Sequence, residues 1–352
     1  MSFRKMVKRT LVIGDLHFDN KPFGLLEAQK KAVIKLFRKV ILEDHVTDVI
    51  FLGDLMMHRK PYPRVLLALQ EVINYISSVA KVYIIRGNHD SENKSDDGTT
   101  ALSLFDNALD VKVITQTWVD DSNRRVFVPH YEDEEKIKEV LAQVPEGYRI
   151  FGHFGYHGAL NSAGDADFGI SPSEFRNSCV LGHIHRFEQV TQGADKSVVT
   201  LTVLGTPYTT NFSEYKKENF YGIIKEGELT IHPIEFGPRH LVVDYDLVEE
   251  NLDWINDKKY FTLLRINLST IDRDQNNVAD LMDKLDVGYV EVKYKPVVDA
   301  KFDQNEMHPD NAVIEVNDLL IEEYINASNT TLGKEALLNG LSLIHENQQS
   351  RN

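Results

Sequence analysis

The sequence predicts an α/β fold in which a parallel sheet covered by helices packs against a second sheet, followed by a smaller α+β domain and C-terminal helices. Three patterns predict it. Residues 10–90 alternate between short apolar runs and longer segments with apolar residues at helical spacing. Residues 124–206 hold apolar, partly β-branched runs with few helical segments between them. Beyond about residue 240 a shorter strand–helix–strand pattern follows.

The first of these patterns has the order βαβαβ. Strand-like runs occupy residues 10–15, 46–54 and 80–90, and helical patterns occupy residues 24–45 and 63–79. This order implies parallel strands that are buried between helix layers and joined by right-handed crossovers.

The second pattern consists of the runs RRVFVPH, YRIFGHF, SCVLGHIH and VVTLTVLGT. Their apolar, β-branched composition is typical of buried strands. Because few helical segments separate them, we interpret them as a further sheet packed on the first.

Length and composition describe an ordinary globular protein. The chain has 352 residues, which exceeds the comfortable size of one hydrophobic core and favours one large domain plus a smaller one. It is 42% hydrophobic and 26% charged. The single cysteine, Cys179, excludes an internal disulfide framework and fits a reducing compartment.

The N-terminal MSFRKMVKR is basic, but only LVIG follows the next threonine before Asp15 interrupts the apolar run. This run is too short for a signal peptide, and no stretch approaches the roughly 18 apolar residues of a membrane span. We therefore expect a cytoplasmic chain, in the host cytoplasm if it is phage-encoded, without membrane contact.

The formal net charge is −15, which argues against a broad basic face that grips nucleic acid. A nucleic-acid enzyme is not excluded, because bound metal ions and local basic patches can hold phosphates. The acidic runs at residues 131–139 and 242–259 are interpreted as solvated faces.

Polar side chains follow the apolar runs at five places, each directly after a glycine. In open α/β sheets ligands bind beyond the carboxyl ends of the strands, so these side chains are expected to converge. The residues are Asp15, His17, Asp54, Asn88, His89, Asp90, His153, His183 and His185.

Carboxylate, imidazole and carboxamide groups without thiolates suit a pair of divalent metals such as manganese, iron or zinc. Glycine before each group lets the backbone turn tightly and keeps the approach to the metal clear. A single aspartate at a strand end is ordinarily a turn residue. The repetition at five strand ends is what indicates a metal site.

The motifs D-x-H, GD, GNHD, GH and GHxH occur in this order over residues 13–185, and the sequence there resembles the calcineurin-like metallophosphoesterases. The resemblance implies a four-layer sandwich of two packed mixed sheets flanked by helices. VLGTPYTTNFSEY (203–215) and the following strand pair ending in Pro-Arg (219–241) resemble more closely the SbcD-type nuclease subunits of double-strand-break repair complexes, which include phage recombination endonucleases.

The resemblance also implies which residues bind metal. The first ion would be held by Asp15, His17 and His185, and the second by Asn88, His153 and His183. The carboxylate of Asp54 would bridge both. Two such ions, roughly 3.5 to 4 Å apart, can activate water and neutralise a transition state at phosphorus. Mn²⁺ is the expected cofactor, with Mg²⁺, Fe²⁺ and Zn²⁺ as alternatives.

His89 is implied to be catalytic: it would hydrogen-bond the scissile phosphate or protonate the leaving oxygen, with Asp90 orienting its ring. Many family nucleases have a histidine three residues after the bridging aspartate, where this chain has Met57 and, one place later, His58. Either the loop is rearranged so that His58 contacts substrate, or His58 is an exposed residue without a role. His157 is interpreted as a loop residue and the remaining histidines as structural.

Three domains are expected: a nuclease domain at 1–240, a cap that presents DNA at 241–311, and a helical segment at 312–352. The cap could instead be an accessory domain without a specific function. The helical segment could fold back on its own domain or dock onto the coiled coil of an SbcC-type ATPase, as the resemblance implies for a nuclease homodimer within a heterotetramer. The sequence has no P-loop, so any ATP-driven step would need another polypeptide.

Three functions compete at this point. The favoured one is a DNA exonuclease and endonuclease subunit that acts in recombination and double-strand-break processing. A phosphatase or small-molecule phosphodiesterase would share the same core. A binding subunit with a decayed metal site is disfavoured by the intact set of candidate ligands.

Overall fold

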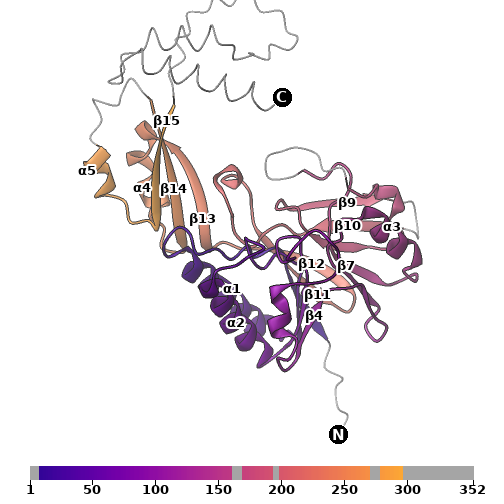
Figure 1. Ribbon diagram of the computed structural model, residues 1–352. Helices are drawn as coiled ribbons and strands as arrows, with labels where there is room; N and C mark the ends of the chain where they lie inside the picture. Colours follow the sequence, from indigo (N-terminus) through magenta and orange to yellow (C-terminus); the bar gives the residue numbers. More distant parts are fainter. Residues whose placement is uncertain (1–7, 161–168, 193–197, 270–277, 296–352) are drawn as a thin grey trace, which may run out of the picture. The chain divides into compact units, whose positions relative to one another are not determined.

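The computed structural model describes residues 8–160, 169–192, 198–269 and 278–295 (Figure 1). The helices expected at 312–352 and the end of the expected cap, from residue 296, lie outside the described residues. Among the described residues, no helix is long and apolar enough to cross a membrane.

The first sheet has six strands in the order β12-β11-β1-β2-β3-β4. Its four parallel strands are β1 (Arg9–Ile13), β2 (Asp48–Phe51), β3 (Lys81–Ile85) and β4 (Val111–Ile114). The antiparallel strands β11 (Phe220–Lys225) and β12 (Glu228–Pro233) extend it beyond β1. The predicted parallel order of the first three strands is confirmed.

Two helices, α1 (Leu25–Asp44) and α2 (Pro63–Ser77), lie side by side on one face of the first sheet (Figure 1). Pro63 opens α2 at a position where a helix needs no backbone N–H. α2 buries Val65, Leu69, Val72 and Ile76, whose spacing of three or four residues places them on one face.

The second sheet has the order β5-β6-β7-β8-β10-β9. Its strands are β5 (Trp118–Asp120), β6 (Arg125–Val128), β7 (Arg149–His153), β8 (Cys179–Gly182), β9 (Glu188–Gln192) and β10 (Val199–Val203). Helix α3 (Glu134–Gln143) packs Ile137 and Leu141 against this sheet. The acidic run at 131–139 therefore includes the start of a helix that the sequence interpretation did not predict, with Asp133 as its N-cap.

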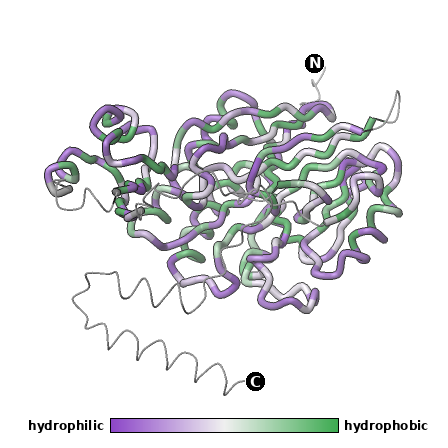
Figure 2. Tube along the Cα trace, turned by 90° about the horizontal axis from the view of Figure 1, so that it is seen from above, coloured by the Kyte–Doolittle hydropathy of each residue, from purple (hydrophilic) through white to green (hydrophobic). Residues whose placement is uncertain are grey.

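Successive residues of the inner strands face opposite layers. Leu11 and Ile13 of β1 pack in the same cluster as α1 and α2, whereas Val12 packs with Phe127 and Phe151 of the second sheet. In Figure 2 many of the hydrophobic segments accordingly run through the middle of the molecule. The layers run helix, sheet, sheet, helix, which confirms the predicted fold class.

A third, parallel sheet consists of β13 (Gly237–Asp244), β14 (Tyr260–Ser269) and β15 (Tyr289–Lys295). The short helices α4 (Leu252–Ile255) and α5 (Val278–Met282) accompany it. The sequence pattern places Pro238 and Arg239 at the end of the strand pair. In the structure the second strand of this pair, β12, ends at Pro233, and Pro238 and Arg239 lie in β13. β13 spans the expected boundary at residue 240, and that boundary stays a prediction.

The remaining helical elements of the described residues are short 3-10 turns. They are η1 (Ala101–Phe105), η2 (Pro172–Glu174), η4 (Phe212–Glu214), η5 (Tyr245–Leu247) and η6 (Glu249–Asn251). Of these turns, η4 lies beside the site described below. β13 is held to the segment that precedes η4, because the backbone N–H of His240 donates to the Thr209 hydroxyl at 2.7 Å.

Candidate metal centre

The carboxyl ends of the strands bring the candidate ligands together from both inner sheets. β1, β2 and β3 lead into Asp15, Asp54 and Asn88, while β7 ends at His153 and β8 leads into His183. This convergence is the one that the sequence predicts.

The backbone around the site is locally strained. His17, Asp54 and His183 have left-handed backbone angles, with φ of 44°, 48° and 84°. Such angles are uncommon outside glycine and cluster at functional sites. Tight turns directly after the strands therefore aim these side chains back over the sheet edge.

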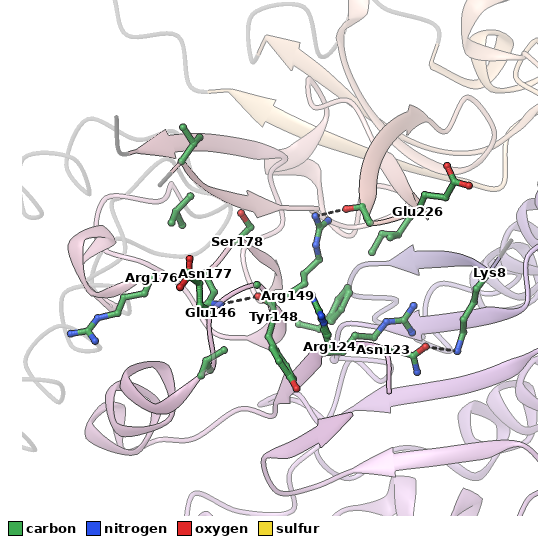
Figure 3. A pocket seen from close by; sticks show the side chains of 18 residues that line it. Lys8, Asn123, Arg124, Glu146, Tyr148, Arg149, Arg176, Asn177, Ser178 and Glu226 are labelled. Atoms are coloured by element: carbon green, nitrogen blue, oxygen red, sulfur yellow. Dashed lines mark hydrogen bonds between the residues drawn. The ribbon is translucent and has the colours of Figure 1, made fainter. Parts of the chain in front are cut away.

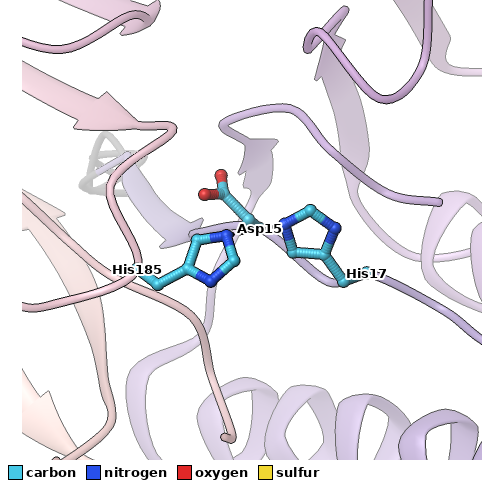
Figure 4. A group of neighbouring side chains, drawn as sticks. All are labelled: Asp15, His17 and His185. Carbon is cyan, nitrogen blue, oxygen red and sulfur yellow. Dashed lines mark hydrogen bonds between the residues drawn. The ribbon is translucent and has the colours of Figure 1, made fainter. Parts of the chain in front are cut away.

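Asp15, His17 and His185 form the first ligand group, and their side chains point toward one another in Figure 4. Their candidate ligand atoms all lie within 4.8 Å of one another, and the Nε2 atoms of His17 and His185 are 2.9 Å apart. Asp15 is fully buried. Its Oδ2 accepts a hydrogen bond from the backbone N–H of His183 at 2.9 Å.

Asn88, His153 and His183 form the second ligand group. Oδ1 of Asn88 lies 2.9 Å from Nε2 of His153 and 3.0 Å from Nδ1 of His183. Nδ1 of His153 is 2.8 Å from the carbonyl oxygen of Leu52, to which it can donate only when it carries the proton. That contact leaves Nε2 of His153 facing the group.

The carboxylate of Asp54 lies between the two groups. Its Oδ2 is 3.6 Å from Nε2 of His17 and 3.4 Å from Nε2 of His153. Its Oδ1 accepts from the backbone N–H of His89 at 2.8 Å, which fixes the orientation of the carboxylate. Asp54 is thus placed where one oxygen could reach a cation on either side.

The electrostatics of the site show the effect of burying several titratable groups together. Burial raises the pKa of Asp15 to about 7. Burial alone would lower the pKa of His153, but the charge and hydrogen bond of Asp54, together with the charge of Asp15 and the carbonyl of Leu52, outweigh it and raise this pKa to about 9. Burial and the neighbouring His153 lower the pKa of His183 to about 3. The buried Asp54 carboxylate thus favours the protonated form of His153.

The residues fit a pair of divalent cations. The buried Asp15 Oδ1 and His17 Nδ1 have no hydrogen-bond partner within the described part of the chain. Unpaired buried carboxylate oxygens are costly unless a cation or a proton compensates them. The donor set of carboxylate, imidazole and carboxamide atoms is one that borderline divalent metals accept.

His89 lies against the first ligand group. Its Nδ1 is 2.6 Å from the carbonyl oxygen of Met57, and its ring meets that of His17 edge-on, with centroids 4.9 Å apart. A donating Nδ1–H leaves Nε2 as the free ring nitrogen. His17, Asp54 and His89 also have candidate ligand atoms within 4.8 Å of one another, so His89 borders the site that the other residues form.

Asp90 does not orient the ring of His89, contrary to expectation. Its Oδ1 accepts from the backbone N–H groups of Leu55 and Met56 at 3.0 and 3.2 Å, and its Oδ2 accepts from that of Gly87 at 3.0 Å. All these bonds go to the backbone, so Asp90 fixes the loops after β2 and β3. The carbonyl of Met57 is the group that holds the His89 ring.

His58 and His157 lie outside both ligand groups. The side chain of His58 is 58% exposed, and its Nε2 is 3.9 Å from a carboxylate oxygen of Asp19. His157 is exposed in the loop after β7. The structure thus brings neither histidine into the centre, and contact of His58 with substrate remains a proposal.

Two residues of the site were missed by sequence reasoning. His130, interpreted as structural, has its ring centroid 6.0 Å from that of His183, and both its ring nitrogens lack hydrogen-bond partners within the described residues. Glu214 is buried with Oε1 2.7 Å from Nδ1 of His185. Two features of the sequence could have pointed to these residues. His130 follows the β6 run after one proline, and Glu214 is the only carboxylate in the stretch 203–215.

A cavity of about 1290 Å³ lies at the opposite edge of the sheets, where β6 and β7 begin (Figure 3). Its lining includes Lys8, Arg125 and Arg149. Arg125 and Lys8 both pair with Asp48, at 3.2 and 2.8 Å, and Arg149 donates to the carbonyl of Gly227 at 2.9 Å. These cations are engaged in holding the sheets, and the cavity is separate from the metal centre.

Comparison with known proteins identifies the class. Residues 8–187 match the family model of the calcineurin-like phosphoesterases, which is more than half of the chain. The chain therefore belongs to this family of metal-dependent phosphoesterases, which use divalent metal ions. No curated protein matches the chain. All seven candidate ligands fall inside the matched region, whereas Glu214 and the third sheet lie beyond it.

Proposed function

We propose that this phosphoesterase is a DNA nuclease subunit of the SbcD type, which hydrolyses phosphodiester bonds during recombination and double-strand-break processing. The observation that carries the hydrolytic part is the position of Asp54 Oδ2, 3.6 Å from Nε2 of His17 and 3.4 Å from Nε2 of His153. The nuclease part is supported by the stretch 203–241 and by the additional α+β unit that follows the family region.

The first ligand group would hold one divalent ion, the second ligand group another, and Asp54 would contact both. Such a pair of ions supplies a water of lowered pKa and charge that neutralises the reacting phosphate. The protein's own contribution is to fix the ligands in place: the carbonyl of Leu52 holds the ring of His153, and the backbone N–H of His89 holds Asp54. Mn²⁺ is the proposed physiological ion.

His89 is the proposed catalytic residue. With Nδ1–H directed at the carbonyl of Met57, Nε2 is the ring nitrogen that can hydrogen-bond the scissile phosphate or deliver a proton to the leaving oxygen. Asp90 supports catalysis indirectly, because it fixes the loop that carries His89. For His58, which is exposed beside Asp19, we propose a contact with the substrate.

The acidic surface requires a partner for a firm grip on duplex DNA, since the formal net charge is −15. We propose a coiled-coil ATPase of the SbcC type as that partner, bound through residues 312–352, in a heterotetramer built on a homodimer of this chain. The proposed setting is the cytoplasm, or the host cytoplasm for a phage protein.

The test is to incubate the full chain and Mn²⁺ in parallel with linear duplex DNA, a chromogenic phosphodiester and a phosphopeptide. The proposal expects cleavage of DNA and of the phosphodiester, with the phosphopeptide untouched. Asp54→Asn should abolish both activities, and His157→Ala, at an exposed histidine outside the centre, should retain them. Dephosphorylation of the peptide with intact DNA would favour the phosphatase alternative instead.

A further inference from the structure

Glu214 is a buried carboxylate beside a candidate metal ligand, in a segment for which the proposed function gives no role. It ends η4 and is 3% exposed. Its Oε1 lies 2.7 Å from Nδ1 of His185, on the side of the ring away from Nε2. Nε2 is the atom that lies 2.9 Å from His17 in the first ligand group.

The other contacts of Glu214 hold its carboxylate in place. Lys217, whose side chain is 9% exposed, places Nζ 2.7 Å from Oε2 and donates at 2.9 Å to the carbonyl of His185. The backbone N–H of Thr210 donates to Oε2 at 2.8 Å, and its hydroxyl donates to Oε1 at 2.9 Å. The side-chain amide of Asn211 adds a bond to Oε1 at 3.1 Å. The carboxylate is thus immobilised from several directions.

An ionised carboxylate can only accept hydrogen bonds, so the bond to His185 requires the proton on Nδ1. Nε2 of the neutral ring then carries a lone pair and no hydrogen. A histidine that binds a metal through Nε2 needs this tautomer, and carboxylates commonly hold metal-binding histidines in this way.

We propose that Glu214, held by Lys217, is a positioning residue that fixes His185 in the Nδ1–H tautomer and presents Nε2 to the first metal. This inference rests on the proposed assignment of His185 as a ligand. It gives the stretch 203–215, which lies after the family region, a role in the metal centre: an element outside the matched domain sets the affinity of one of its two sites.

The first test uses the metal-free full chain labelled with ¹⁵N-histidine, with the His185 signals assigned by their loss in His185→Asn. Long-range ¹H–¹⁵N correlation should show a protonated Nδ1 and an unprotonated Nε2 in the wild type and in the control Glu218→Ala, which removes an exposed carboxylate nearby. Glu214→Ala should lose this preference. A folded Glu214→Ala that keeps the Nδ1–H tautomer would overturn the proposal.

The second test measures Mn²⁺ binding by calorimetry and electron paramagnetic resonance. Glu214→Ala should lose roughly 10- to 100-fold in affinity at one of two sites. If that variant does not fold, Glu214→Gln decides, because its carbonyl oxygen can still accept from Nδ1–H but its amide faces Lys217 and Thr210. A smaller loss at one site is expected, and unchanged affinity at both sites would contradict the role.

The two tests separate this inference from the proposed function. Since the tautomer is measured without metal or DNA, a wild type that fails to cleave DNA leaves the Glu214 result decisive. A wild type that binds no Mn²⁺ at all would refute the metal assignment, while the resonances of His185 would still show whether Glu214 controls its tautomer.

Discussion

At the scale of single residues, substitution of His89 is the clearest way to separate catalysis from metal binding. Replacing it by Ala or Asn should slow DNA cleavage by roughly 10² to 10⁴, the usual range for a positioned acid or base, and leave Mn²⁺ binding unchanged. The reason is that its Nδ1 contacts the carbonyl of Met57 and its other ring nitrogen faces the site. Cleavage rates and Mn²⁺ calorimetry check this. Loss of one Mn²⁺ in the variant would make His89 a ligand.

Cys179 provides a prediction that is independent of the metals. It is 1% exposed in β8, and burial raises the pKa of its thiol well above the ordinary value. At pH 8 the folded protein therefore holds it as the unreactive thiol, whereas the unfolded chain exposes a group that titrates near that pH. We expect no reaction with Ellman's reagent in buffer and one equivalent in guanidinium. Rapid reaction of the native protein would mean that β8 opens readily.

The sequence could predict the candidate ligands because each lies within three residues after a glycine at the end of an apolar strand. It could not assign Glu214, because its partner His185 lies 29 residues earlier and the contact exists only once η4 folds against that loop. Asp90 was placed at the site for the same reason as its neighbours. Its actual partners are the backbone amides of Leu55 and Met56 in a different loop and of Gly87 in its own, and such backbone contacts leave no mark in the sequence.

At the scale of elements, the turn after β1 closely approaches the turn after β10 at Gly14 and Gly205. A Cβ on Gly14 would lie 1.8 Å from the carbonyl oxygen of Gly205, which is backbone and cannot turn aside. Gly14→Ala should destabilise the fold by roughly 3 kcal/mol or more, or prevent folding. Urea denaturation measures this.

The matched control is Gly222→Ala in β11 of the same sheet. There the closest atom to the added Cβ is Cδ1 of Leu229 at 2.9 Å, the end of a flexible side chain that can move, and the next two lie at ordinary contact distances of 3.7 and 3.9 Å. Its stability should stay close to that of the wild type. Equal effects of the two substitutions would show that the contact between Gly14 and Gly205 is not the limiting one.

Elements with a strong apolar pattern were predictable and edge elements were not. The inner strands β1, β2, β3, β7 and β8 each contain an apolar run. β9, at the edge of the second sheet, has only partly buried or exposed residues, so its sequence EQVTQ shows no such run. α3 begins with charged residues and buries only Ile137 and Leu141, which is too little for its periodicity to stand out.

At the scale of the whole molecule, we propose that residues 312–352 recruit the chain to its partner. Residues 312–352 lie outside the described residues, and their role as a docking segment stays a prediction. A chain that ends at Asn311 should lose association with its coiled-coil ATPase in a pull-down and retain Mn²⁺-dependent cleavage of DNA. Undiminished association would place the contact elsewhere on the chain.

The central claim is that two divalent ions share Asp54 at the carboxyl edge of the paired sheets. Anomalous diffraction from Mn²⁺-loaded crystals of the full chain tests it most directly. We predict two anomalous peaks roughly 3.5 to 4 Å apart, on either side of the Asp54 carboxylate, each next to one of the two ligand groups. A single peak, or a pair of peaks that Asp54 does not contact, would contradict the claim.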